Sequence, residues 1–167
     1  MSELEEFRQR KDLLFKENPQ SPLPLEEKEK FSGLKYYPLN PDLKFGVPLE
    51  KTVEENLEFE TSSGERKVYK KIGGLNFKVG ETAAKLTLYQ AESGSFFLPF
   101  RDATSGQETY GAGRYLEVKE ENGNFELDFN YAYNPYCAYG SGYSCPLPPM
   151  ENWLKVPIAA GEKKYYE

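Results

Sequence analysis

Histidine is absent from this chain of 167 residues. Its absence excludes Ser-His-Asp and Cys-His catalysis, paired-histidine metal helices and haem held by histidine. The two cysteines are too few for a four-cysteine zinc site. No apolar run approaches the roughly 18 residues of a transmembrane helix, so we expect no membrane association.

Positive charge is in deficit, with 21 Lys and Arg against 27 Asp and Glu and a net charge of −6. A general nucleic-acid binder needs a basic surface that displaces counterions from phosphates, so nucleic acid is not an expected partner. Residues 1–10 (MSELEEFRQR) show neither the basic start nor the apolar core of a secretory signal. We therefore expect a cytoplasmic protein.

Aromatic and turn-forming residues are abundant: 13 Tyr, 11 Phe, 14 Gly and 12 Pro. Many aromatic residues between many turns favour strands over a helical bundle. A length near ~150 residues fits one domain. We expect a mainly β fold, an antiparallel β sandwich or barrel with one or two N-terminal helices. Residues 1–33 should form a helical segment packed on a β domain of residues 34–167.

The first residues predict helix. Ser2 and Glu5 form a capping-box pattern, and the helix should end at Asn18 because a proline follows it and disfavours the helical conformation there. A second, short helix is predicted with Pro24 in its first turn and Gly33 as its stop.

Alternating runs in the rest of the chain predict strands. Residues 34–50 contain three prolines and are expected to form a loop with short extended pieces. The strand candidates are residues 57–61, 67–72, 75–79 and 84–89, with 152–158 as a final edge strand.

The clearest hairpin is predicted around Asn122 and Gly123, because both residue types accept the positive φ angles of a type I′ turn. Its strands would cover residues 113–121 and 124–131. A two-residue turn fixes the register, so Val118 should face Leu127 on an apolar side.

The other side of this hairpin should carry Tyr115 beside Asn130 and Glu117 beside Asp128. Two carboxylates at cross-strand distance repel each other, which should raise the pKa of one of them. Such a pair serves general acid–base catalysis or holds a hard cation such as magnesium or calcium. The alternative, which we favour, is a solvated outer face.

Arg114 follows Gly111 and Gly113. Glycines let a backbone approach a ligand closely, and the guanidinium can bind a carboxylate or phosphate with its planar fork. Equally, Arg114 could pair with Asp102 or Glu162 within the fold. Residues 102–106 (DATSG) predict a capped turn and no catalytic motif.

Cys137 and Cys145 lie in a stretch, residues 134–149, that is too rich in Pro and Gly for regular structure. They could form a disulfide, bind a metal, act in catalysis or pack as two thiols, and packed thiols are favoured. Tyrosines are dense in the same region. Such rings suit sugars and other small polar ligands or, as we favour, fill the core; they are Tyr131, Tyr133, Tyr136, Tyr139 and Tyr143.

Long motifs between residues 98 and 162 resemble a known family. They include LPFRDATSG (98–106), GRYL (113–116), AYNP (132–135) and CPLPP (145–149). In order and spacing they resemble the prokaryotic family designated domain of unknown function 1684, and residues 21–23 and 31–38 resemble its N-terminal part. The resemblance implies no particular activity. The family's pattern includes an acidic residue at Glu117, together with Arg114, Asp128, Asn130, Cys137, Cys145 and Glu162.

These observations predict a β domain that binds a small polar ligand, with no cofactor required by the sequence and no confident metal site. The expected site lies on the 113–131 hairpin and the 134–149 loop, and comprises Arg114, Tyr115, Glu117, Asp128, Asn130, Asn134, Cys137, Cys145 and Glu162. One alternative is a hydrolase that uses the Glu117/Asp128 carboxylate pair, with or without a metal ion. The other is a structural protein without a ligand.

Overall fold

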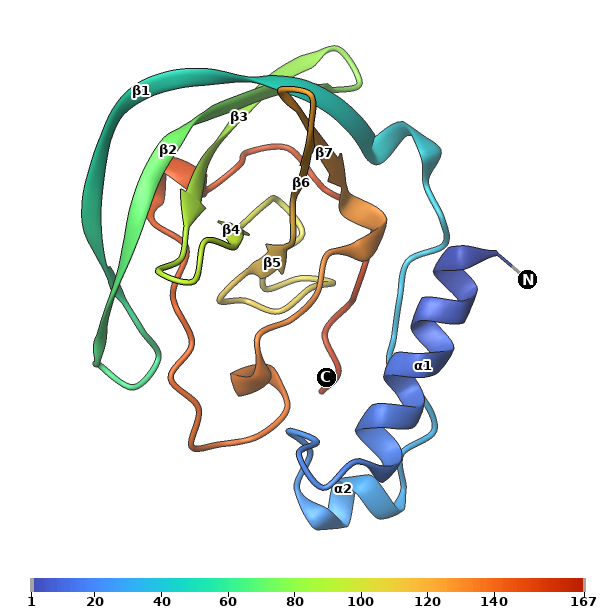
Figure 1. The fold of residues 1–167 in the computed structure, drawn as a ribbon. Coiled ribbons are helices and arrows are strands. Elements are labelled where there is room, and N and C mark those ends of the chain that lie inside the picture. The colour runs from blue at the N-terminus through green and yellow to red at the C-terminus, as the bar shows by residue number, and fades with distance from the viewer. Residues whose placement is uncertain (1, 167) are drawn as a thin grey trace.

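The computed structural model of the protein describes residues 2–166, and within them the chain forms one antiparallel sheet that curls into a half-barrel (Figure 1). The strand order is β5-β4-β3-β2-β1-β7-β6. The mainly β fold expected from the sequence is therefore confirmed. The strands are β1 (Lys44–Glu60), β2 (Arg66–Val79), β3 (Thr82–Gln90), β4 (Phe96–Phe100), β5 (Arg114–Leu116), β6 (Lys119–Glu121) and β7 (Asn124–Asp128).

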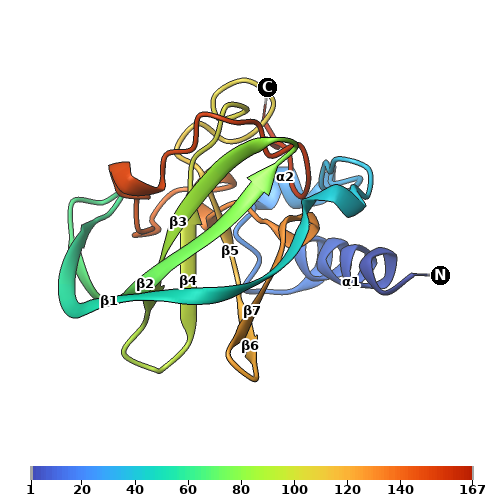
Figure 2. The same cartoon turned by 90° about the horizontal axis from the view of Figure 1, so that it is seen from above.

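Two helices lie to one side of the sheet (Figures 1 and 2). The first, α1 (Glu3–Glu17), has the predicted capping box, in which Ser2 Oγ accepts from the Glu5 amide at 3.1 Å, and it ends at the predicted place. The second, α2 (Leu25–Glu29), ends earlier than predicted. The Lys16 amino group donates to two carbonyls at the end of α2, which satisfies backbone groups that a longer helix would have paired.

Four short 3-10 helices occupy the connections among residues 2–166: η1 (Pro41–Leu43), η2 (Phe129–Tyr131), η3 (Tyr136–Ala138) and η4 (Met150–Asn152). The predicted edge strand at 152–158 is wrong, because Trp153 makes only an isolated parallel bridge with Arg101. Residues 134–149 form no strand, as predicted from their proline and glycine content. No helix within the described residues is long and apolar enough to cross a membrane.

Strands β1 and β2 are longer than predicted. The candidates at 67–72 and 75–79 are one strand, because a bulge between Lys71 and Gly73 breaks the alternation that the sequence pattern relies on. The expected loop at 34–50 contains the start of β1. Pro48 is tolerated there because it lies at the last residue of the β1–β7 pairing, where β1 loses a neighbour.

The two sides of the sheet differ in what covers them. Strand alternation places Leu88, Leu98 and Leu116 on the side of the main hydrophobic core, which we call the core side. It places Phe97 and Tyr115 on the opposite, outer side, where their ring centroids lie 4.9 Å apart. A second apolar cluster of Phe15, Leu23, Ala138 and Tyr139 joins α1 to the 134–149 loop.

The predicted hairpin forms at its tip but does not extend as far as expected. Asn122 and Gly123 have φ angles of 55° and 80°, and Lys119 pairs with Glu126 in the predicted register. The ladder stops there, because β5 pairs with β4 instead of β7. The chain between β5 and β6 changes partners, so one predicted strand becomes two.

This change of partners makes the predicted polar side of the hairpin wrong. Asp128 pairs with Lys44 of β1, and the β6–β7 ladder does not reach Glu117. Tyr115 exchanges two backbone hydrogen bonds with Tyr133, at 2.8 and 2.9 Å, and does not pair with Asn130. The predicted register fails because residues 129–131 leave the extended conformation and form η2.

Candidate functional site

The predicted site residues lie in separate places in the structure. One group belongs to a buried polar cluster on the core side of β5, a second group caps η2, and a third lines a pocket on the outer side. Glu117 and Cys137 belong to none of these: Glu117 is exposed between β5 and β6, and Cys137 lies in η3. The three groups are Arg114 with Glu162, Asp128 with Asn130, and Tyr115 with Asn134 and Cys145.

The polar cluster is centred on Arg114, which is fully buried. Its guanidinium donates to Asp102 Oδ1 at 3.3 Å and to the backbone carbonyls of Ile158, Ala160 and Glu162. The pair with Asp102 confirms one of the two predicted roles of Arg114. Burial lowers the pKa of Arg114 and the nearby Asp102 carboxylate opposes that shift, so the buried charge has its counterion beside it.

Asp102 also shapes the turn that the sequence predicts at 102–106. Its Oδ2 accepts from the Thr104 hydroxyl at 2.8 Å and from the Ile158 amide at 2.6 Å. Gly106 completes the turn with a φ angle of +82°. One carboxylate therefore joins the turn, β5 and the C-terminal segment.

Glu162 is 1% exposed and closes the same cluster from the C-terminal side. It accepts hydrogen bonds from Lys11 of α1, from the Tyr139 hydroxyl and, at 3.4 Å, from the Asn134 amide. Burial, reinforced by Glu162, raises the pKa of Tyr139 well above its usual value. Because these charges are enclosed by protein donors and acceptors, the geometry of the cluster favours a structural role.

The second group, Asp128 and Asn130, is hydrogen-bonded to the segment before β1 at Asn40. Asp128 Oδ1 accepts from the Asn130 amide at 3.1 Å and from its side chain at 2.9 Å. The Asn130 side chain in turn exchanges two hydrogen bonds with the Asn40 backbone, at 2.8 and 3.0 Å. Both side chains are thus engaged in local backbone contacts. Within residues 2–166, no three His, Cys, Asp or Glu side chains gather into a group that could hold a metal ion.

The third group lines an open pocket of about 280 Å³, which we call the tyrosine pocket. Tyr115 reaches it from the outer side of β5, and the other lining residues follow in the chain from 133 to 146. The Tyr115 hydroxyl donates to the Pro146 carbonyl, which fixes one wall. The lining residues are Tyr115, Tyr133, Asn134, Pro135, Tyr136, Tyr143, Ser144, Cys145 and Pro146.

Four tyrosine rings form the walls of this pocket. The rings of Tyr115 and Tyr133 lie 5.8 Å apart at 83°, and those of Tyr136 and Tyr143 lie 5.4 Å apart at 71°. Burial raises the pKa of Tyr115 and of Tyr133, so both hydroxyls are neutral at physiological pH. The sequence pattern singles out the tyrosine cluster but favours a core role, which the structure gives to Tyr139 in the second apolar cluster and in part to Tyr131, which packs against the main core.

Polar groups at the pocket include one without a partner. Asn134 is 1% exposed, and its Nδ2 donates to the Tyr139 hydroxyl at 3.2 Å and to the Lys163 carbonyl at 3.1 Å. Its Oδ1 is buried and accepts no hydrogen bond from the described residues. A buried acceptor without a donor is costly, and a ligand donor would relieve that cost.

Both cysteines are free thiols. Cys145 lines the pocket, and burial raises the pKa of its thiol, which disfavours the thiolate that a nucleophile needs. Cys137 accepts a hydrogen bond from the Tyr110 hydroxyl at 3.6 Å. Of the predicted alternatives, the structure shows two thiols without a disulfide.

The loop that carries most of the pocket is fastened to the end of the β1–β2 hairpin. Ser62 donates its amide to the Cys145 carbonyl at 2.9 Å, and the Cys145 amide returns a bond to Ser62 Oγ at 3.0 Å. Sequence reasoning missed Pro135, Ser144 and Pro146 as site residues, because nothing in a proline-rich loop signals which residues face a cavity. These contacts hold the loop in place without a strand.

The comparisons with known proteins give a family and a solved structure that are both described without a function. The solution NMR structure of an uncharacterized protein from Haloarcula marismortui is 38% identical, with a TM-score of 0.73 over 96% of this chain and 91% of that chain. No curated protein matches this sequence. The sequence model of the family described as protein of unknown function (DUF1684) matches residues 29–163, which confirms the resemblance seen in the motifs. The chain therefore belongs to this family.

Proposed function

We propose that the protein binds a small, uncharged, ring-shaped ligand in the tyrosine pocket. The observation that carries the proposal is the combination of four tyrosine rings with one buried, unpaired acceptor, Asn134 Oδ1. The volume of about 280 Å³ suits a single ring with its substituents.

The lining chemistry supports this ligand class. Tyrosine and proline side chains offer flat apolar surfaces against which a sugar or a heterocycle can stack. No charged residue lines the pocket, so a charged ligand would lose hydration without gaining a counterion. Asn134 Oδ1 calls for a hydroxyl or N–H donor on the ligand.

This proposal keeps part of the site expected from the sequence. It retains Tyr115, Asn134 and Cys145, and it narrows the expected site on the 113–131 hairpin and the 134–149 loop to Tyr115 and residues 133–146. The hydrolase alternative needs Glu117 and Asp128 as a facing pair, and the strand pairing gives it no support. The two free thiols support the expected cytoplasmic location, where such thiols stay reduced.

Saturation-transfer NMR with two panels of probes, methyl glycosides and nucleobases, tests the proposal. We expect at least one panel to bind the wild-type protein with a Kd on the order of 1 mM, as fragment-sized ligands do. Tyr136→Ala should abolish the signal. Tyr166→Ala is the matched control, because Tyr136 and Tyr166 are each 42% exposed and only Tyr136 lines the pocket.

Two results would overturn this function. One is the absence of binding by both panels. The other is binding that Tyr136→Ala leaves unchanged in a variant whose amide spectrum shows the native fold.

A further inference from the structure

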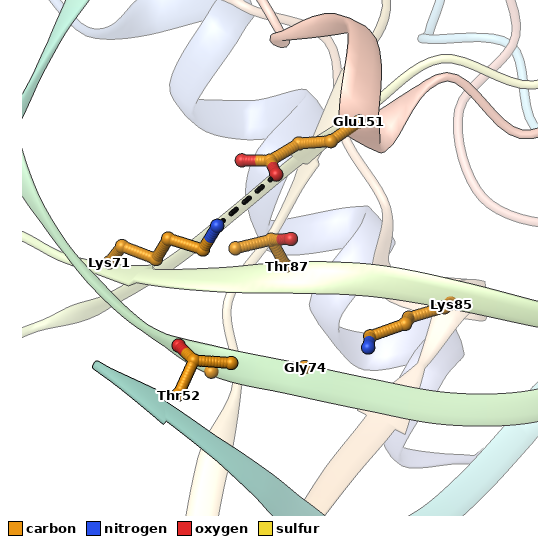
Figure 3. A pocket seen from close by; sticks show the side chains of 7 residues that line it. Thr52, Lys71, Gly74, Lys85, Thr87 and Glu151 are labelled. Atoms are coloured by element: carbon orange, nitrogen blue, oxygen red, sulfur yellow. Dashed lines mark hydrogen bonds and ion pairs between the residues drawn. The ribbon is translucent and has the colours of Figure 1, made fainter. Parts of the chain in front are cut away.

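A second pocket lies on the outer side of the sheet, away from the tyrosine pocket (Figure 3). Its volume is also about 280 Å³, and we call it the lysine groove. Lys71 and Lys85 approach from opposite sides, with Thr87 and Gly74 between them, and both side chains turn inward. The lining residues are Thr52, Lys71, Gly73, Gly74, Lys85, Thr87 and Glu151.

Two consecutive glycines of β2 line the lysine groove and let neighbouring groups lie directly against the backbone. A Cβ at Gly73 would lie 2.5 Å from the Glu50 carbonyl oxygen, and a Cβ at Gly74 would lie 2.4 Å from Lys85 Cε. A side chain at Gly74 would therefore displace Lys85, and one at Gly73 would collide with the backbone of β1. Glycine inside a strand marks a bulge or a close approach to the backbone, and β2 has its bulge here.

The wall opposite these glycines is held rigidly. Asn152, fully buried at the end of η4, accepts from the Thr87 amide at 2.8 Å and donates to the Thr87 carbonyl at 2.9 Å. It also donates to the Pro99 carbonyl at 2.8 Å, so it bridges β3 and β4 where these strands separate. These bonds fix the neighbouring Glu151 and Thr87, and the groove is preformed.

Each lysine in the groove has an acidic partner that is also held by a neutral donor. Lys71 lies 3.5 Å from Glu151, which also accepts from the Tyr89 hydroxyl. Lys85 lies 3.1 Å from Glu50, and Asn76 donates to the same carboxylate at 2.7 Å. The Asn76 bond is the largest of the influences that lower the pKa of Glu50. Either lysine can therefore turn to a ligand while its carboxylate keeps a hydrogen bond.

We propose that the lysine groove binds a phosphate group, carried by a small phosphate ester or present as inorganic phosphate. Two ammonium groups from opposite sides and the hydroxyls of Thr52 and Thr87 line the groove. A tetrahedral phosphate has oxygens on all sides and accepts from both walls at once, whereas a planar carboxylate has two oxygens on one edge. This site is independent of the ligand proposed for the tyrosine pocket.

Titration of the 15N-labelled protein with inorganic phosphate, at constant ionic strength, tests the site. We expect saturable shifts of the Gly73, Gly74 and Thr87 amides with a Kd on the order of 1 mM, the strength that a few charge-assisted hydrogen bonds give. Lys71→Met and Lys85→Met should each weaken binding by about tenfold. Lys78→Met is the control, because it removes an equal charge from β2 at an exposed residue outside the groove.

Several outcomes would overturn the proposal. Phosphate would only screen surface charge if the amide shifts do not saturate. The same conclusion would follow if Lys78→Met raises the Kd as much as Lys71→Met does. Equal binding of acetate would remove the assignment to phosphate. If one lysine variant fails to fold, the other decides the question, since each must weaken binding on its own.

Discussion

Arg114 and Tyr115 are adjacent residues of β5, yet they belong to regions with opposite properties. Arg114 lies on the core side, where its charge is enclosed by Asp102 and three backbone carbonyls. Tyr115 lies on the outer side, where it forms a wall of an open pocket. The charges of the polar cluster are paired with one another and with backbone carbonyls, although Arg114 Nε has no acceptor within residues 2–166. The tyrosine pocket, in contrast, is open and includes Asn134, whose Oδ1 has no donor among the same residues.

The difference shows that polarity alone does not identify a binding site. A buried ion pair with many protein partners has few hydrogen-bonding groups left for a ligand. Removal of one partner lowers the stability of the fold. A pocket of neutral rings costs little to open and keeps its contacts for a ligand. Substitutions on the core side of β5 should therefore lower the free energy of unfolding, whereas substitutions on its outer side should weaken ligand binding.

The largest effect is expected from Arg114→Met. It leaves Asp102 as a buried charge without its cation, and the free energy of unfolding should fall by about 3–5 kcal/mol. Urea unfolding measures the loss. The double variant Arg114→Met/Asp102→Asn should lose less than the sum of the single changes, because both remove the same interaction. A single-variant loss below about 1 kcal/mol would contradict the structural role of the cluster.

Tyr139→Phe should have a moderate effect. The change removes a hydroxyl that donates to Glu162 and accepts from Asn134, and a buried group left without its partner costs about 1–3 kcal/mol. Thermal or urea unfolding checks this value. Unchanged stability would show that Lys11 and the Asn134 amide suffice to hold Glu162.

Alkaline pH should weaken the fold. Burial and a hydrogen bond to Glu108 raise the pKa of Tyr37 to about 12, and burial beside Cys137 raises that of Tyr110 to about 12. A raised tyrosine pKa means that the folded state binds the phenolic proton more tightly than the unfolded state does. The stabilisation that this proton gives is complete below pH 10.0, the ordinary tyrosine pKa, and is lost as the pH rises through about 12.

Phenolate absorbance and circular dichroism, followed together against pH, check the alkaline prediction. The late-titrating tyrosines should ionise together with unfolding. Ionisation of all tyrosines near their ordinary pKa in a protein that stays folded would contradict the burial of these hydroxyls.

The smallest effect on stability is expected from Tyr136→Ala in the tyrosine pocket. This side chain is 42% exposed, and its ring makes edge-to-face contacts with Phe15 and Tyr143. The free energy of unfolding should change by less than about 1 kcal/mol, measured by urea unfolding, although ligand binding is lost. A loss as large as that of Arg114→Met would erase the distinction between the two regions.

Local chemistry was readable from the sequence. The Ser2 capping box and the Asn122–Gly123 turn were predicted and are present, and the pairing of Arg114 with Asp102 is one of the alternatives that the sequence left open. Each depends on residues within one turn, or on a charge that needs one nearby partner.

Long-range pairing was not readable. The hairpin turn fixes the register for only a few residues, and beyond them the packing of β5 on β4 decides the partner. The tyrosines of the 134–149 loop look alike in sequence, yet Tyr139 is in the core and Tyr136 is at the pocket. The residues of the lysine groove come from β1, β2, β3 and η4, so their spacing in the sequence does not predict that they lie together.

The most direct test of the account is a map of amide shifts in the 15N-labelled protein, saturated with whichever probe panel binds. We predict that the largest shifts fall at residues 133–145, on the Tyr115 side of β5, and that the amides of residues 102–106 and 158–162 around Arg114 stay unchanged. Largest shifts around Arg114 would contradict it and would make the buried cluster the binding site.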